Sequence, residues 1–193
     1  MFIGCSLVRR FLTATLVGWL ISFSWEPAAG QSLTFGGDAQ HTSSYAPAAE
    51  NLNLIKWSTN IDFNNSGALV HYGSPLVTAS NTVLVPVKTA TNGFRVDAFS
   101  GISGTPKYTV STDYILPAHN WIPSFNPCVV TGAFGTRMYF AGAGGTIWHI
   151  DNVDSNTPGP PVREVFYTSI AAYNANASAY NNSIFVNTPI TAD

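Results

Sequence analysis

Few residues of this sequence have the chemistry of a functional site, and three of them stand out by position. His71 lies just before Gly73-Ser74-Pro75, and His119 and Trp121 lie just before a similar strand start at Asn126-Pro127. Ligand sites form where several strand ends converge. We therefore take His71, His119 and Trp121 as candidate ligand-binding residues. The alternative is that the histidines cap turns in loops and that Trp121 packs between sheets.

Other possible sites have a structural explanation that the sequence favours. His149 and Asp151 are two residues apart on a predicted strand, so they share a face that metal binding or acid–base chemistry could use. Asp151 is matched by Asp97 in an internal repeat, however, and a repeated aspartate is typical of a residue that accepts backbone hydrogen bonds in a turn. The glycine-rich stretch 142–146 lacks the lysine and the helix of a phosphate loop and is predicted to be a turn. We predict no catalytic residue and no metal ligand.

Composition and cysteine usage narrow the class of protein. The chain is 46% hydrophobic and 9% charged, against about 25% charged in ordinary soluble domains, which indicates buried and uncharged polar strands. The formal charge is −2 and the basic residues are scattered, so a nucleic-acid partner is excluded. Cys128 lies in a strand-like run and is predicted to be a buried thiol rather than a nucleophile.

Residues 1–30 have the pattern of a secretory signal peptide. Arg9 and Arg10 precede an apolar run, Phe11–Phe23, and small residues up to Gly30 provide a cleavage site. The apolar run is shorter than the roughly 20 residues that cross a bilayer, although an uncleaved anchor is the alternative. We therefore expect a secreted or periplasmic protein with no membrane span in the mature chain.

An internal repeat determines the predicted fold. Residues 73–110 read as four short strands separated by turn signals at 80–81, 91–93 and 100–104. A second copy has predicted strands at 127–131, 137–141, 146–151 and 162–167, and its Pro127 and Gly145 both follow their counterparts, Pro75 and Gly93, by 52 residues. The motif Thr188-Pro189-Ile190-Thr191 predicts the first strand of a third copy, after a loop or short helix at 169–182.

Four-stranded units of this kind bury their faces by stacking radially. We therefore predict an all-β fold, a partial β-propeller of four-stranded antiparallel blades. After the signal peptide, residues 31–66 would form an N-terminal arm with a strand at 52–61, and residues 67–193 the partial propeller. Its blades would span residues 69–112 and 121–168, with the start of a further blade at 183–193.

The repeat resembles that of pyrroloquinoline-quinone-like β-propellers. The shared features are the Ser-Pro strand start, a Gly turn, an aromatic strand ending in Asp, and the lead-in Phe35-Gly36-Gly37-Asp38 followed by Ile55-Lys56-Trp57. This resemblance implies a ring of about six to eight blades, with the remaining blades downstream and the strand at 52–61 completing the last blade. His71, His119 and Trp121 would then lie at the mouth of the central channel.

The same resemblance leaves two functions open. Members of this superfamily include quinone-dependent alcohol and sugar dehydrogenases as well as scaffold proteins that bind no cofactor. The quinone enzymes typically carry an adjacent Cys-Cys pair, which this sequence does not contain. We therefore expect an exported, non-catalytic module without a cofactor that binds a protein or glycan partner. The alternative is the N-terminal part of a dehydrogenase that uses pyrroloquinoline quinone (PQQ) and calcium, with its catalytic residues in other blades.

Overall fold

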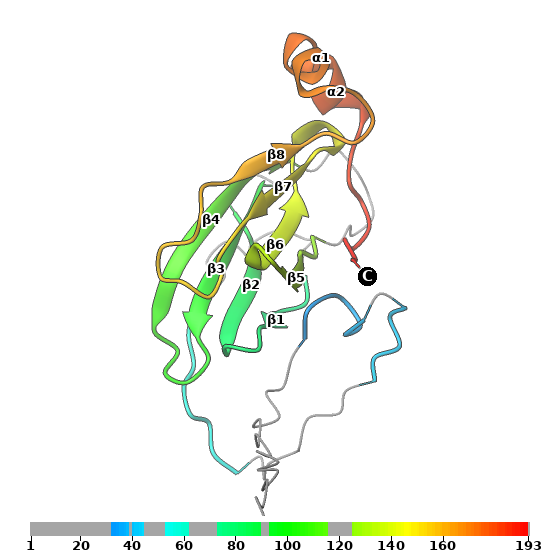
Figure 1. Cartoon of the computed structure of the whole chain (residues 1–193). Coiled ribbons are helices and arrows are strands. Elements are labelled where there is room, and N and C mark those ends of the chain that lie inside the picture. The colour runs from blue at the N-terminus through cyan, green and yellow to red at the C-terminus, as the bar shows by residue number, and fades with distance from the viewer. Residues whose placement is uncertain are drawn as a thin grey trace, which may run out of the picture.

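The computed structural model describes residues 32–38, 40–44, 53–61, 73–89, 93–115 and 125–192. These residues form two four-stranded antiparallel sheets, each built from consecutive strands (Figure 1). The first sheet consists of β1 (Leu76–Val77), β2 (Thr82–Lys88), β3 (Gly93–Ser100) and β4 (Pro106–Ile115). The second consists of β5 (Cys128–Gly132), β6 (Gly135–Ala141), β7 (Ile147–Ile150) and β8 (Val162–Glu164). The all-β class and both sets of four strands are confirmed.

Three short helical segments belong to the second half of the chain. The 3-10 turn η1 (Ala143–Gly145) joins β6 to β7, and α1 (Ile170–Ala175) and α2 (Ala177–Ser183) follow β8. Both α-helices lie at one end of the second sheet, beyond β7 and β8 (Figure 1). Ser169 caps α1 by accepting a hydrogen bond from the Ala172 amide. The predicted loop or short helix at 169–182 is therefore a pair of helices.

The strands are separated where residues can adopt positive φ. Asn81 has φ of 59° in the β1–β2 turn, and Gly104 has φ of 71° in the β3–β4 turn. A Cβ atom on Gly104 would lie 2.6 Å from the Trp57 ring, so this glycine also allows the indole to pack against the turn. The turns predicted at 80–81 and 100–104 are confirmed.

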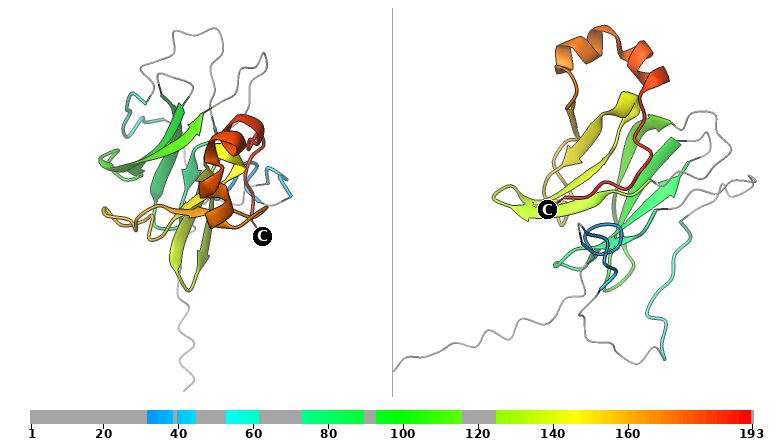
Figure 2. Two further views of the ribbon diagram at one scale, coloured as in Figure 1. Left: turned by 90° about the horizontal axis from the view of Figure 1, so that it is seen from above. Right: turned by 90° about the vertical axis from the view of Figure 1, so that its right-hand side faces the viewer.

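The two sheets pack face to face on one hydrophobic core. Alternation along the strands places one set of apolar side chains of each sheet between them. Leu84, Val96 and Met138 are fully buried there, as are Phe140 and Ile150. Figure 2 shows the two sheets next to each other, with α1 and α2 beyond one end of the second sheet. A single core therefore links strands that are about 50 residues apart in sequence.

Two side chains of the segment 53–61, Trp57 and Ile61, pack on the opposite face of the first sheet. Ile61 packs on Val85 and Phe99, and the Trp57 ring stacks on Phe99 with 6.5 Å between ring centroids. The prediction of a strand over 52–61 is wrong for the described part, 53–61, which forms no strand. An extended segment becomes a strand only when a neighbour pairs with its backbone, and these residues contact the sheet through side chains instead.

The N-terminal arm contacts the first strand of each sheet, and the C-terminal tail contacts the segment just before β5. Ser32 forms an antiparallel bridge with Val77 of β1, and the Leu33 carbonyl accepts a hydrogen bond of 2.7 Å from the Val129 amide of β5. The Ile190 amide donates to the Asn126 carbonyl at 3.2 Å. The arm therefore crosses from one sheet to the other, beside the tail.

The predicted first strand of a third copy is not a strand. Residues 177–183 belong to α2, and residues 184–192 form no strand. Ile190 makes one backbone hydrogen bond to the segment before β5, and its carbonyl accepts another from the Thr34 hydroxyl. Isolated hydrogen bonds do not make a ladder, because a strand needs a neighbour that pairs along its length.

Candidate functional site

The three predicted site residues, His71, His119 and Trp121, lie outside the described residues. Described residues that follow them in the chain are in contact. The Ser74 amide donates a hydrogen bond of 2.6 Å to the side-chain carbonyl of Asn126. The chain therefore enters the first strands of both sheets at one shared position.

The predicted pair His149 and Asp151 is part of a structural network. The Asp151 carboxylate accepts two hydrogen bonds from the Arg137 guanidinium, with Nη2 and Oδ2 3.0 Å apart. These hydrogen bonds lower the pKa of Asp151. Asp151 thus binds a side chain of β6 rather than the backbone of a turn, which corrects the sequence interpretation.

The proposed equivalence of Asp97 and Asp151 is also wrong. Two ladders of paired residues cross the sheets, Leu76–Leu84–Ala98 in the first and Cys128–Tyr139–His149 in the second. Because Ala98 corresponds to His149, the counterpart of Asp151 is Ser100. Asp97 lies within β3 on the face that carries Phe99, where it binds Arg95 and Thr109. A shift of one residue along a strand reverses the face.

His149 is buried beside a carboxylate. Its Nδ1 lies 3.2 Å from Oε1 of Glu164, in a geometry that does not make a hydrogen bond. Its ring lies 5.8 Å from that of Tyr139. Among the described residues, no group of three or more His, Cys, Asp or Glu side chains could hold a metal ion.

Cys128 and the glycine-rich turn have structural roles. Cys128 is free and buried in β5, and burial raises the pKa of its thiol to about 11. The prediction of a buried thiol is therefore confirmed. Around η1, the Gly144 carbonyl accepts a hydrogen bond from the Tyr167 hydroxyl, and Tyr173 and Asn181 pack over the same glycine. This loop joins β6 to β7, and side chains of the helical segment occupy the space above it.

An arginine of β8 closes a cluster between the two sheets. The Arg163 guanidinium lies 4.1 Å from the centroid of the Trp148 ring and pairs with the Asp113 carboxylate of β4. Asp113 also accepts hydrogen bonds from the Trp148 indole and the Ala143 amide. Burial would raise the pKa of Asp113, but these hydrogen bonds and the Arg163 charge together hold it below its usual value. The polar groups of the cluster satisfy one another, so it ties the sheets together.

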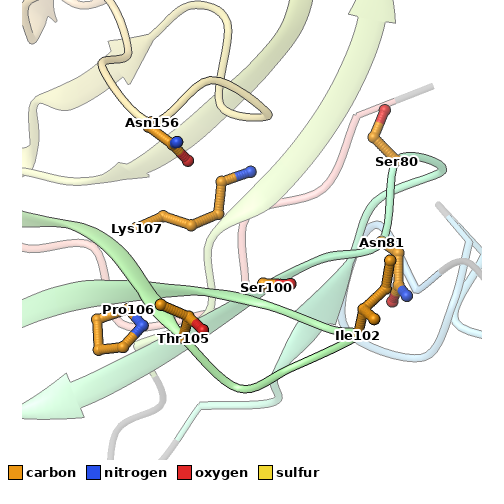
Figure 3. A pocket seen from close by; sticks show the side chains of 8 residues that line it. All are labelled: Ser80, Asn81, Ser100, Ile102, Thr105, Pro106, Lys107 and Asn156. Atoms are coloured by element: carbon orange, nitrogen blue, oxygen red, sulfur yellow. The ribbon is translucent and has the colours of Figure 1, made fainter.

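A polar hollow lies at the end of the sheets opposite to Gly73. We call it the inter-sheet pocket, a hollow of about 340 Å³ lined by Ser80, Asn81, Ser100, Ile102, Thr105, Pro106, Lys107 and Asn156 (Figure 3). The first sheet contributes its β1–β2 and β3–β4 turns and the start of β4. The second sheet contributes Asn156 from the loop after β7. The turns that follow the first and third strands of an antiparallel sheet share one end, so the topology gathers these groups.

Lys107 is the charged group of the inter-sheet pocket, and its position is set by the protein. Its Nζ donates hydrogen bonds to the Thr82 hydroxyl at 2.9 Å and to the Asp154 carbonyl at 2.6 Å. Burial would raise the pKa of the Asp154 carboxyl, but hydrogen bonds from three threonines, among them Thr78, and the charge of Lys107 hold it below the usual value. The Asp154 carboxyl is therefore charged at neutral pH.

Hydrogen bonds from both sheets hold the pocket walls in place. The Tyr108 hydroxyl donates to the Val153 carbonyl at 2.6 Å, which joins β4 to the loop that carries Asn156. The Gly101 amide donates to the Asn81 carbonyl at 2.8 Å, and the Trp57 indole donates to the Gly101 carbonyl at 2.9 Å. These bonds connect the two turns of the first sheet and fix them relative to the second.

Sequence reasoning missed this pocket because its residues carry turn signals. Asn81 and Ser100 were recognised only as turn residues, and Lys107 only as one of several scattered basic residues. A lysine directly after a predicted turn was the available signal. Its proximity to Asn156 depends on how the sheets pack.

Comparison with known proteins adds no assignment. No family profile matches the chain, and no curated protein matches it. Among the described residues, no helix has the length and apolar character needed to cross a membrane.

Proposed function

We propose that this chain is part of an exported β-propeller that binds a protein or glycan partner and does not catalyse a reaction. The inter-sheet pocket is the observation that carries this proposal. Its lining consists of hydroxyl, amide and ammonium groups with two apolar side chains. Its one titratable side chain, Lys107, already donates two hydrogen bonds to the protein. Such a lining suits recognition of a polar ligand rather than proton transfer or nucleophilic attack.

The stacking of the sheets supports the propeller. The face of the second sheet that points away from the first sheet carries Cys128, Val130, Tyr139, Ile147 and His149. By the ladder equivalence above, this face corresponds to the face of the first sheet that packs on the second. This face contains a hollow with a volume of about 460 Å³, which residues 190–192 also line. A further sheet packed there would repeat the contact between the first two, as the resemblance to quinone-type propellers implies.

Export is supported by the charge and hydropathy pattern of residues 1–30. Mass spectrometry of the protein from a secreting host tests it. Cleavage after Gly30 is the expected result, and a chain that keeps its leader and stays with the cell would contradict export.

An enzyme assay tests the non-catalytic role. The full-length protein is incubated with pyrroloquinoline quinone and calcium, and its cofactor absorbance and its turnover of alcohols and sugars with an artificial electron acceptor are measured. We expect neither stoichiometric cofactor uptake nor turnover. Quinone-dependent oxidation of an alcohol or sugar would replace the proposal with the dehydrogenase alternative.

A further inference from the structure

We infer that the inter-sheet pocket binds an acidic sugar residue of a glycan, with Lys107 as the partner of the sugar carboxylate. This inference rests on the proposed function, since it names the ligand class of the same pocket. Three properties of the lining carry it: groups that pair with hydroxyls, an apolar edge, and one ammonium that forms no ion pair with a carboxylate of the described residues.

The polar lining matches the hydroxyl groups of a sugar. Ser80 and Thr105 supply hydroxyls that both donate and accept, and the Asn156 amide supplies two donors and an acceptor. All three residues are exposed at the rim. Adjacent sugar hydroxyls also donate and accept at once, so a lining of hydroxyls and amides can satisfy them in pairs.

Ile102 and Pro106 give the pocket an apolar edge. The Ile102 side chain is 78% exposed, which is unusual for a residue of its size in a polar turn. A sugar ring has a face of C–H groups beside its hydroxyls. Packing that face on Ile102 and Pro106 would bury apolar area on both partners.

The ammonium of Lys107 selects an acidic ligand. A lysine has three N–H donors, and two are used by Thr82 and Asp154. Within the described part of the chain, Lys107 forms no ion pair, although its charge acts on the nearby Asp154 carboxyl. Figure 3 shows its side chain extending between Asn156 and the residues of the β3–β4 turn. A carboxylate at the third donor would form a charge-assisted hydrogen bond, which is stronger than a neutral one.

The size and shape of the pocket favour one unit of a glycan over a peptide. Its volume of about 340 Å³ is near the lower end of the roughly 300–1,000 Å³ range for small-molecule sites. Its exposed rim leaves room for a chain to continue on either side. A peptide strand binds by pairing with a free sheet edge, whereas this pocket is built mainly from turns.

Calorimetric titration of the full chain with tetragalacturonate tests the inference. The neutral probe is the same oligosaccharide with its carboxylates methyl-esterified, and poly-glutamate serves as the acidic peptide. We expect binding of tetragalacturonate that weakens with added salt, at least about tenfold weaker binding of the neutral probe, and no comparable binding of poly-glutamate.

Three variants locate the binding site. Lys107→Met should weaken binding of tetragalacturonate at least about tenfold, because it removes the charged donor. Asn156→Ala should weaken it about two- to tenfold without affecting folding, since no hydrogen bond from this side chain to the protein is seen in the described residues. Lys88→Met is the matched control, because it removes the same charge at the other end of β2, and it should bind like the parent.

Three results would overturn the inference: no binding of tetragalacturonate, equal binding of the neutral probe, or equal losses in Lys88→Met and Lys107→Met. Lys107-dependent binding of poly-glutamate alone would show a peptide ligand and would also overturn it. None of these results affects the quinone assay, so the non-catalytic role is judged separately.

Discussion

Replacing Leu84 with alanine tests whether the two sheets share one core. Leu84 is fully buried in β2, in the cluster that contains Met138 and Ile150 of the second sheet. Removing a buried leucine side chain costs about 2–5 kcal/mol, because apolar burial is lost and a cavity remains. For a chain of this size, each kcal/mol lowers the melting temperature by about 2–4 °C. We therefore expect Leu84→Ala to melt about 6–12 °C lower if the loss is about 3 kcal/mol.

Urea unfolding followed separately by far-UV circular dichroism and tryptophan fluorescence measures this change. If the core is shared, both signals should shift together in one transition, since the tryptophans lie in different parts of the chain. Ile102→Ala is the control, because its side chain is 78% exposed and its loss should change stability by less than about 0.5 kcal/mol. A loss below about 1 kcal/mol for Leu84→Ala, or two separate transitions of which only one moves, would refute a shared core.

Three further predictions concern titrating groups. The pKa of Asp154 is lower in the folded protein than in the unfolded chain. Its contribution to stability is therefore present above the unfolded pKa of about 4 and is lost as the pH falls through the folded pKa. The urea midpoint of unfolding should drop in acid, and Asp154→Asn should show a smaller drop. Cys128 is buried, and burial raises the pKa of its thiol to about 11. The Cys128 thiol should therefore not react with a disulfide reagent at pH 8 until urea unfolds the chain. Rapid labelling of Cys128 in the native protein would show that β5 is accessible. Burial raises the pKa of Tyr114 to about 12, and its hydroxyl donates to the Val186 carbonyl. Tyr114→Phe should cost about 1 kcal/mol in a urea titration and remove one high-pH tyrosinate from the ultraviolet titration, and an unchanged titration would contradict its burial.

Strand positions were accessible from the sequence because they depend on local pattern. Val83, Val85 and Val87 alternate in β2, and the turn signals at 80–81 and 100–104 bound the strands on either side. Backbone preferences and side-chain alternation act over a few residues, so a short stretch is enough to read them.

Segments that need a distant partner were read less well. The stretches 53–61 and 188–191 have strand-like sequences but form no strand in the structure. Nothing in a short stretch shows whether another backbone is available to pair with it. The match of Asp97 to Asp151 failed for a related reason, because sequence spacing does not reveal a one-residue shift of a ladder.

The sequence by itself determined that this chain forms two similar four-stranded sheets, since alternation and turn residues act locally. Only the tertiary structure decided which faces meet, that the arm crosses from Val77 to Val129, and that Lys107 lies in one pocket with Asn156. Those contacts join residues 45 or more positions apart in the sequence. They follow from the burial of one common core, which is a property of the whole fold and of no single segment.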